Sequence, residues 1–198
     1  SYSVLLSALN LQGCEASGTL NINVFPAPIS EFEISQELLC GIPSTIFLTN
    51  NSYGGQTYSW ELNNQQVSSD IEPAFEATQI GLQQVDLLVT NSFECTSEST
   101  EFVEVYENPI PQVIITPQEG CEPLELLVED ISLGAISTNI TIANSEWFVY
   151  NGGVTEDQIS IVNSGNYVLN MVAISPDGCI SNMSDPEIIN VWPLPDTD

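Results

Sequence analysis

Five cysteines carry most of the potential chemistry of this chain, and they are regularly spaced: Cys14, Cys40, Cys95, Cys121 and Cys179. The intervals from Cys14 to Cys95 and from Cys40 to Cys121 are both 81 residues, and the interval from Cys95 to Cys179 is 84. A thiol can join a disulfide, bind a metal ion or act as a nucleophile. Regular spacing in a chain without histidine favours disulfides, and disulfides indicate an extracellular location.

The spacing leaves the pairing of these cysteines open. Pairing within a repeat would join Cys40 to Cys95 and Cys121 to Cys179, and would leave Cys14 to find a partner outside the chain. Pairing between repeats would join Cys40 to Cys179, because the turn before the second strand and the turn after the sixth lie at opposite ends of a seven-strand sandwich. A disulfide requires Cα atoms within about 7 Å of each other. Five free thiols are the third alternative.

The composition excludes most forms of side-chain catalysis. The 198 residues include no lysine, arginine or histidine, against 27 aspartates and glutamates, which gives a formal net charge of −27. A Ser-His-Asp triad, a Schiff base and an imidazole metal site are therefore impossible. A carboxylate pair of the glycosidase kind remains. Glu129 with Asp130 and Glu156 with Asp157 are sequence neighbours, however, and neighbours on a strand point to opposite faces. We predict that the chain is not an enzyme.

The missing cations also exclude two classes of partner. Proteins bind phosphate backbones and anionic membrane surfaces through Lys and Arg, so we expect neither nucleic acid nor a membrane as a partner. No apolar run approaches the roughly 18 residues of a membrane span. Ca²⁺ is the one cofactor considered, because it prefers carboxylate and carbonyl oxygens. Asp196 and Asp198 are its candidate ligands, and an ordinary solvated surface is the alternative.

The elements that must position the cysteines repeat along the chain. Segments 2–28, 83–111 and 167–195 each have a cysteine as their thirteenth residue and end in Pro-x-Pro. Prolines two residues apart resist both helix and central sheet pairing, so these ends are predicted linkers. Apolar residues alternate with others before each cysteine, a period that predicts a half-buried strand. The alternating residues are Val4, Leu6 and Ala8, then Val85, Leu87 and Val89, then Leu169, Met171 and Ala173.

The repeat predicts an all-β fold of tandem immunoglobulin-like β-sandwich domains arranged as a rod. Many short strands separated by Gly, Asn and Pro, without a helical period, are typical of this class. Trp60 and Trp147 are predicted core residues, and Phe25 and Trp192 are predicted to pack between consecutive domains. The predicted boundaries are residues 1–25 for the last strands of a truncated repeat, 26–108 and 109–192 for two complete repeats, and 193–198 for the start of the next.

Three motifs resemble the PKD-like repeats of giant cell-surface adhesins of gliding Bacteroidetes, the SprB type in particular. They are Gly-Cys-Glu-Pro-Leu at 120–124, Ser-Gly-Asn-Tyr at 164–167 and Asp-Gly-Cys at 177–179. The chain departs from many PKD domains in one motif, because the Trp-Asp-Phe-Gly-Asp-Gly box is replaced by Trp-Glu-Leu-Asn-Asn at 60–64 and Trp-Phe-Val-Tyr-Asn at 147–151. The resemblance implies PKD-like sandwiches, export by the type IX route and display on the exterior of the outer membrane.

These observations together predict a structural segment of a large secreted adhesin or filament. Like charge and short proline-stiffened linkers would make it a stiff acidic spacer that supports surface attachment or gliding. Its expected partners are neighbouring repeats of the same chain and extracellular polysaccharide or other surfaces. The alternatives are a glycan-binding module and an acidic S-layer or exoprotein repeat of a halophile.

Overall fold

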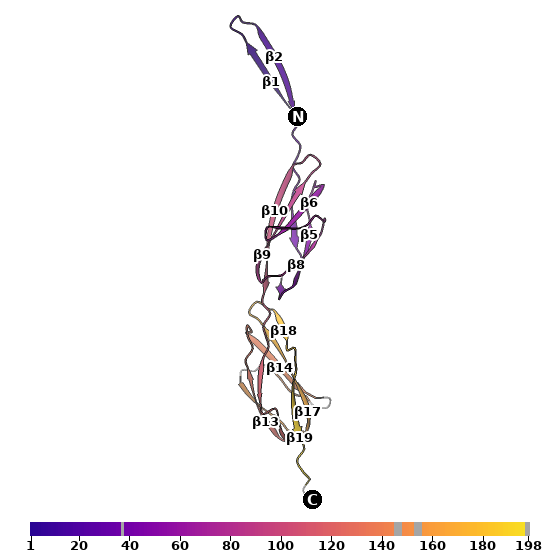
Figure 1. Ribbon diagram of the computed structural model, residues 1–198, viewed down its shortest axis with the longest axis vertical. Coiled ribbons are helices and arrows are strands. Elements are labelled where there is room, and N and C mark those ends of the chain that lie inside the picture. Colours follow the sequence, from indigo (N-terminus) through magenta and orange to yellow (C-terminus); the bar gives the residue numbers. More distant parts are fainter. Residues whose placement is uncertain (37, 145–147, 153–155, 197–198) are drawn as a thin grey trace. The chain divides into compact units, whose positions relative to one another are not determined.

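The computed structural model describes residues 1–36, 38–144, 148–152 and 156–196 (Figure 1). The regular elements among these residues are strands, and they include no helix, which confirms the all-β prediction. The chain divides into two compact units. One comprises Ser1–Ser35, Ile46–Phe75 and Gln83–Val103, and the other comprises Gln36–Thr45, Glu76–Leu82 and Glu104–Asp198.

The chain begins with an antiparallel hairpin of β1 (Tyr2–Leu9) and β2 (Glu15–Ile22). Its register places Val4 opposite Leu20 and Tyr2 opposite Ile22, so one face of the hairpin is apolar. Every residue of both strands is exposed. The predicted strands are therefore confirmed. The burial of one face, which the alternation also predicted, is not found in this hairpin.

Two sheets enclose a core between residues 29 and 106. The first has the order β3-β5-β8, and the second has the order β4-β10-β9-β6-β7. Trp60 is fully buried, as predicted, and packs edge-on against Phe32 and Phe75 of the first sheet at ring-centroid distances of 5.1 and 6.4 Å. The bounds are β3 (Phe32–Ile34), β4 (Leu39–Cys40), β5 (Ser44–Asn50), β6 (Thr57–Leu62), β7 (Gln65–Ser68), β8 (Ala74–Ala77), β9 (Gly81–Thr90) and β10 (Thr96–Tyr106).

A second pair of sheets follows with the same strand order, β11-β13-β16 and β12-β19-β17-β14-β15, and β18 adds to β17. Its core includes Leu126, Ile140, Tyr167, Leu169 and Ile189, each 0% exposed. The bounds are β11 (Val113–Thr116), β12 (Glu119–Cys121), β13 (Leu124–Asp130), β14 (Ser137–Ala143), β15 (Phe148–Gly152), β16 (Glu156–Ile161), β17 (Gly165–Ile174), β18 (Ile180–Asn182) and β19 (Glu187–Trp192).

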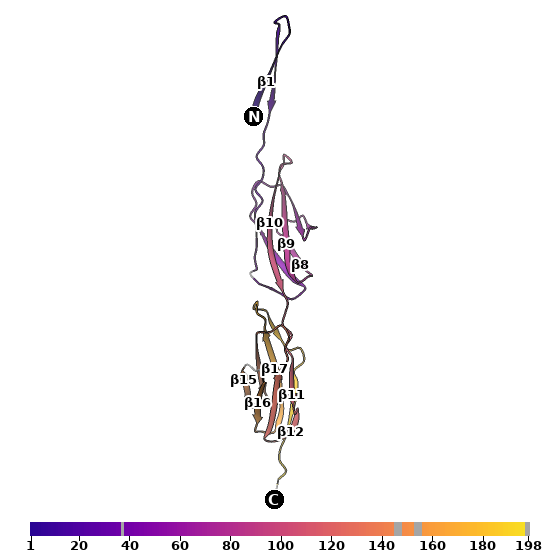
Figure 2. The same ribbon diagram turned by 90° about the vertical axis from the view of Figure 1, so that its left-hand side faces the viewer.

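The segments that match in the sequence form matching strands in the two sandwiches. β9 and β10, which run side by side in Figure 2, correspond to β17 and β19, and the short strands β4 and β12 both pair in parallel with the last long strand. Alternate residues of β9 and β17 face the core, as the period of two predicted. Trp147 lies outside the described residues, so its predicted core position stays a prediction.

Candidate functional site

A disulfide joins Cys40 to Cys179, with their Cα atoms 5.6 Å apart and 139 residues of sequence between them. Cys179 is fully buried and Cys40 is half-buried. Both cysteines belong to the second compact unit, because residues 36–45 group with 104–198. In the sequence, however, Cys40 lies in the repeat predicted at 26–108 and Cys179 in the repeat predicted at 109–192. Of the predicted alternatives, the structure therefore has the pairing between repeats.

The pairing within repeats is wrong, and the position of β4 explains why. Cys40 lies beside Tyr106 at the C-terminal end of β10, whereas Cys95 directly precedes the first residue of that strand. β10 is 11 residues long, so Cys40 and Cys95 are separated by about 35 Å along it. A disulfide cannot span that distance. Cys121 and Cys179 are separated in the same way. Cys121 lies beside Trp192 at the C-terminal end of β19, whereas Cys179 lies in the turn before β18.

Cys40 and Cys121 occupy equivalent positions, and we call them the early-turn cysteines. Each ends a short strand that runs parallel to the last long strand of its sandwich. The backbone N–H of the following residue donates to the carbonyl of that strand's last residue, from Gly41 to Tyr106 at 2.8 Å and from Glu122 to Trp192 at 2.9 Å. The two cysteines are thus held in the same way, and only Cys40 is bonded.

Cys14, Cys95 and Cys179 are the late-turn cysteines, and they share one turn geometry. In each turn, the residue four positions earlier donates its N–H to the carbonyl of the cysteine, and its side-chain oxygen accepts the N–H of the cysteine. The side-chain bonds are Cys14 N–H to Asn10 Oδ1 at 2.9 Å, Cys95 N–H to Asn91 Oδ1 at 3.0 Å and Cys179 N–H to Ser175 Oγ at 3.1 Å. The sequence carries this signal, an Asn or Ser four residues before the cysteine, but the predicted cysteine roles did not draw on it.

Three of the five predicted disulfide cysteines are free in the structure. Cys14 and Cys121 are exposed, and Cys95 is half-buried. The disulfide prediction is therefore confirmed for Cys40 and Cys179 alone.

Carboxylates near the disulfide act on Tyr106, the residue paired with Cys40. The negative charge of Glu104 raises the pKa of the Tyr106 phenol above 10.0, and desolvation, the charge of Asp177 and a hydrogen bond with Glu104 raise the pKa further. Each charge disfavours the phenolate, because like charges repel. The chain has no cation on its side chains to offset this effect.

We predict that Glu104→Gln lowers the pKa of Tyr106, because Glu104 makes the largest contribution to its rise. The measurement is the pH dependence of the tyrosine ring-carbon signals by NMR, with Tyr106 assigned by its Phe variant. Glu101→Gln, on the same strand, is the matched control and should leave the titration unchanged. An unaltered Tyr106 titration in Glu104→Gln would contradict the assignment.

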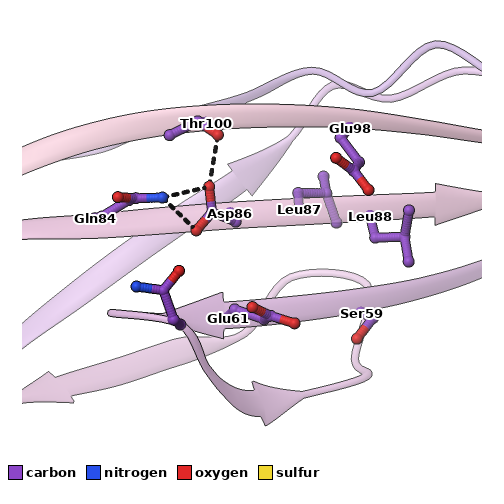
Figure 3. Close-up of a pocket in the computed structure, with 9 residues that line it drawn as sticks. Ser59, Glu61, Gln84, Asp86, Leu87, Leu88, Glu98 and Thr100 are labelled. Atoms are coloured by element: carbon purple, nitrogen blue, oxygen red, sulfur yellow. Dashed lines mark hydrogen bonds between the residues drawn. The ribbon is translucent and has the colours of Figure 1, made fainter.

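A shallow polar groove lies on the outer face of the sheet formed by β6, β9 and β10 (Figure 3), with a volume of about 230 Å³. Glu61, Asp86 and Glu98 are among its lining residues. Asp86 accepts a hydrogen bond from Thr100 at 2.5 Å and two from the Gln84 amide at 2.8 and 3.0 Å, so its oxygens are engaged by the sheet itself. None of the described lining residues is aromatic, and the groove therefore offers no ring on which a sugar could stack.

The carboxylate pairs considered for catalysis lie on β13 and β16. Glu129 is exposed, whereas Asp130 accepts hydrogen bonds from the Ser132 N–H at 2.9 Å and the Thr138 hydroxyl at 2.6 Å. Asp130 therefore acts as a structural acceptor. The register also places Glu129 opposite Glu156 across the two strands, a juxtaposition that neighbours in the sequence do not reveal.

The predicted calcium ligands remain predictions. Asp196 is exposed, and Asp198 lies outside the described residues. Within the described part of the chain, no three His, Cys, Asp or Glu residues are grouped as a metal site would require. The same residues contain no helix of the length and apolarity needed to cross a membrane.

Comparisons with known proteins give similarity at the level of solved structures. No protein-family model matches the chain, and no curated protein sequence matches it either. The chain is similar to the PKD1 domain of Vibrio anguillarum Epp, with 28% identity, 41% of this chain and 96% of that domain covered, and a TM-score of 0.36. It is also similar to the PKD1 domain of the Vibrio cholerae metalloprotease PrtV, with 26% identity, 41% and 99% coverage, and a TM-score of 0.36.

A third similarity is to a Ca²⁺-stabilised adhesin that helps an Antarctic bacterium reach out and bind ice. The identity is 10% and the TM-score is 0.46. The match covers 97% of this chain and 57% of that structure.

Proposed function

We propose that this chain is a non-catalytic structural segment of an extracellular cell-surface adhesin, in which β-sandwich repeats form a stiff acidic spacer. The observation that carries the proposal is the Cys40–Cys179 disulfide. A disulfide persists in an oxidising compartment. This one joins residues of two predicted repeats, and a covalent bond of that kind suits a protein that must keep its length under load.

The charge and the surface support the same role. With a formal net charge of −27 and no basic side chain, successive repeats repel one another over a screening length of about 8 Å at physiological salt. The partners proposed are neighbouring repeats and extracellular polysaccharide or other surfaces. Because the polar groove has no aromatic residue among its described lining, we do not place a glycan site there. We further propose that the protein is exported by the type IX route and has a role in gliding.

Small-angle scattering of the oxidised chain tests the spacer role. Strands of 10 or 11 residues span about 35 Å, so two sandwiches and a hairpin in series would give a radius of gyration of about 30 Å. A compact globule of this length would have a radius of gyration of about 16 Å. A value near the smaller figure at physiological salt would overturn the spacer, and repeating the measurement at two ionic strengths separates shape from charge repulsion between molecules.

A further inference from the structure

The chain contains two early-turn cysteines and three late-turn cysteines in matching geometry, yet one pair alone is bonded. The bonded pair joins an early turn to the late turn of the repeat that follows it in the sequence. Cys121 is held as Cys40 is, at the end of a parallel strand beside the last long strand. Cys14 and Cys95 are held as Cys179 is, by the acceptor four residues earlier.

A second observation concerns the surroundings of two late turns, one with a bonded cysteine and one with a free cysteine. In the second unit, Glu107, Asn108 and Ile110 of the segment after β10 line a shallow pocket. Ser175, Pro176 and Asp177 of the Cys179 turn line the same pocket. In the first unit, the turn that carries Cys95 contacts the segment after β2. Phe93 stacks on Phe25 with ring centroids 3.9 Å apart, and the Asn91 amide donates to the Pro26 carbonyl at 2.7 Å. The Cys95 turn is therefore seated beside the preceding linker although its thiol is free.

We infer that the Cys40–Cys179 bond is one member of a periodic series, in which each early-turn cysteine bonds the late-turn cysteine of the next copy of the repeat. Cys121 is then the docking point for the late turn of a further copy. Cys95 and Cys14 are the points at which an early turn docks. This inference deepens the proposed function and rests on it, since a series of such bonds would limit how far a spacer under tension can lengthen.

The bond needs an oxidant, and a small-molecule disulfide such as oxidised glutathione is sufficient. The Cys121 and late-turn thiols lose two protons and two electrons, and one Sγ–Sγ bond forms. The sulfur–sulfur bond of the oxidant breaks. The oxidant accepts the two protons and two electrons and is released as two thiols. The exchange passes through a mixed disulfide. Exposure of Cys121 and Cys14 gives the oxidant access to both thiols.

The test uses a second copy of this chain as the further repeat. The whole chain is held at high concentration in a glutathione redox buffer, and linked species are analysed by non-reducing electrophoresis and peptide mapping. We expect oligomers in which Cys121 of one copy is linked to Cys14 or Cys95 of another, with Cys40–Cys179 retained. Cys121→Ser should abolish the oligomers, as should the double variant Cys14→Ser with Cys95→Ser, and each single late-turn variant should leave a reduced yield.

Random collision of three free thiols would instead produce every combination, including Cys121 linked to Cys121 and late-turn cysteines linked to one another. Cys121–Cys121 or Cys14–Cys14 as the main product, oligomers that persist in Cys121→Ser, or no linkage at all would each overturn the inference. Circular dichroism of every variant confirms that the sandwiches are folded. Scattering of the single chain tests the spacer without any linkage between copies, so the two proposals can fail separately.

Discussion

Pulled by its two ends in a single-molecule experiment, the oxidised chain is expected to release about 480 Å less unfolded length than a Cys40→Ser/Cys179→Ser variant. The bridged residues are 139 apart in sequence, and an extended chain spans at most about 3.3–3.6 Å per residue. Force enters the bond at Cys40 and leaves it at Cys179, so residues 41–178 lie outside the path of the load. Both sandwich cores can unfold, but the chain between the two bridged cysteines cannot be extended.

The control for this prediction keeps the bond and removes the free thiols. Cys14→Ser, Cys95→Ser and Cys121→Ser combined should reproduce the short length of the oxidised chain, and a reducing agent should then restore the long one. If the oxidised chain extends fully without reduction, the bond does not carry the load. Removing the disulfide that closes this long loop, as in Cys40→Ser/Cys179→Ser, should also lower the free energy of unfolding by about 2–5 kcal/mol.

The sequence was sufficient for the strands and for the repetition of the cysteines, because both depend on local patterns. Alternation before Cys95 and Cys179 predicted β9 and β17, whose alternate side chains are buried. The pairing of Cys40, in contrast, depends on a contact between strands that are distant in the sequence. β4 has two residues, too few for any period to show, and its parallel pairing with the far end of β10 is a tertiary contact. That contact decides which cysteine Cys40 can reach.

The hairpin at 1–25 shows the complementary limit. Its alternation matches that of β9 and β17. A local pattern identifies which face of a strand is apolar, but it does not identify what covers that face. Leu87 on β9 is fully buried, whereas Leu6 at the equivalent position on β1 is 72% exposed. Burial depends on an opposing sheet, and every residue of β1 and β2 is exposed.

Truncation of the buried tryptophan should produce the largest loss of stability from a single core substitution. Trp60 is 0% exposed, contacts Phe32 and Phe75, and donates its indole N–H to the Asp70 carbonyl at 2.9 Å. Trp60→Ala leaves a cavity and an unpaired carbonyl, and we expect it to lower the free energy of unfolding by about 3–5 kcal/mol. Trp60→Phe keeps a ring in the cavity and should cost roughly half as much.

Trp192→Ala is the matched control, because Trp192 is 49% exposed, and a partly exposed side chain loses less on truncation, here about 1 kcal/mol. Urea unfolding followed by far-ultraviolet circular dichroism provides the comparison. Two sandwiches need not unfold together, so Trp60→Ala should move one transition and leave the other in place. The reason is that Trp60 packs in the core between residues 29 and 106, while the core of the other sandwich is built from residues 115–191. Equal destabilisation by the two alanine variants would mean that Trp60 does not anchor this core.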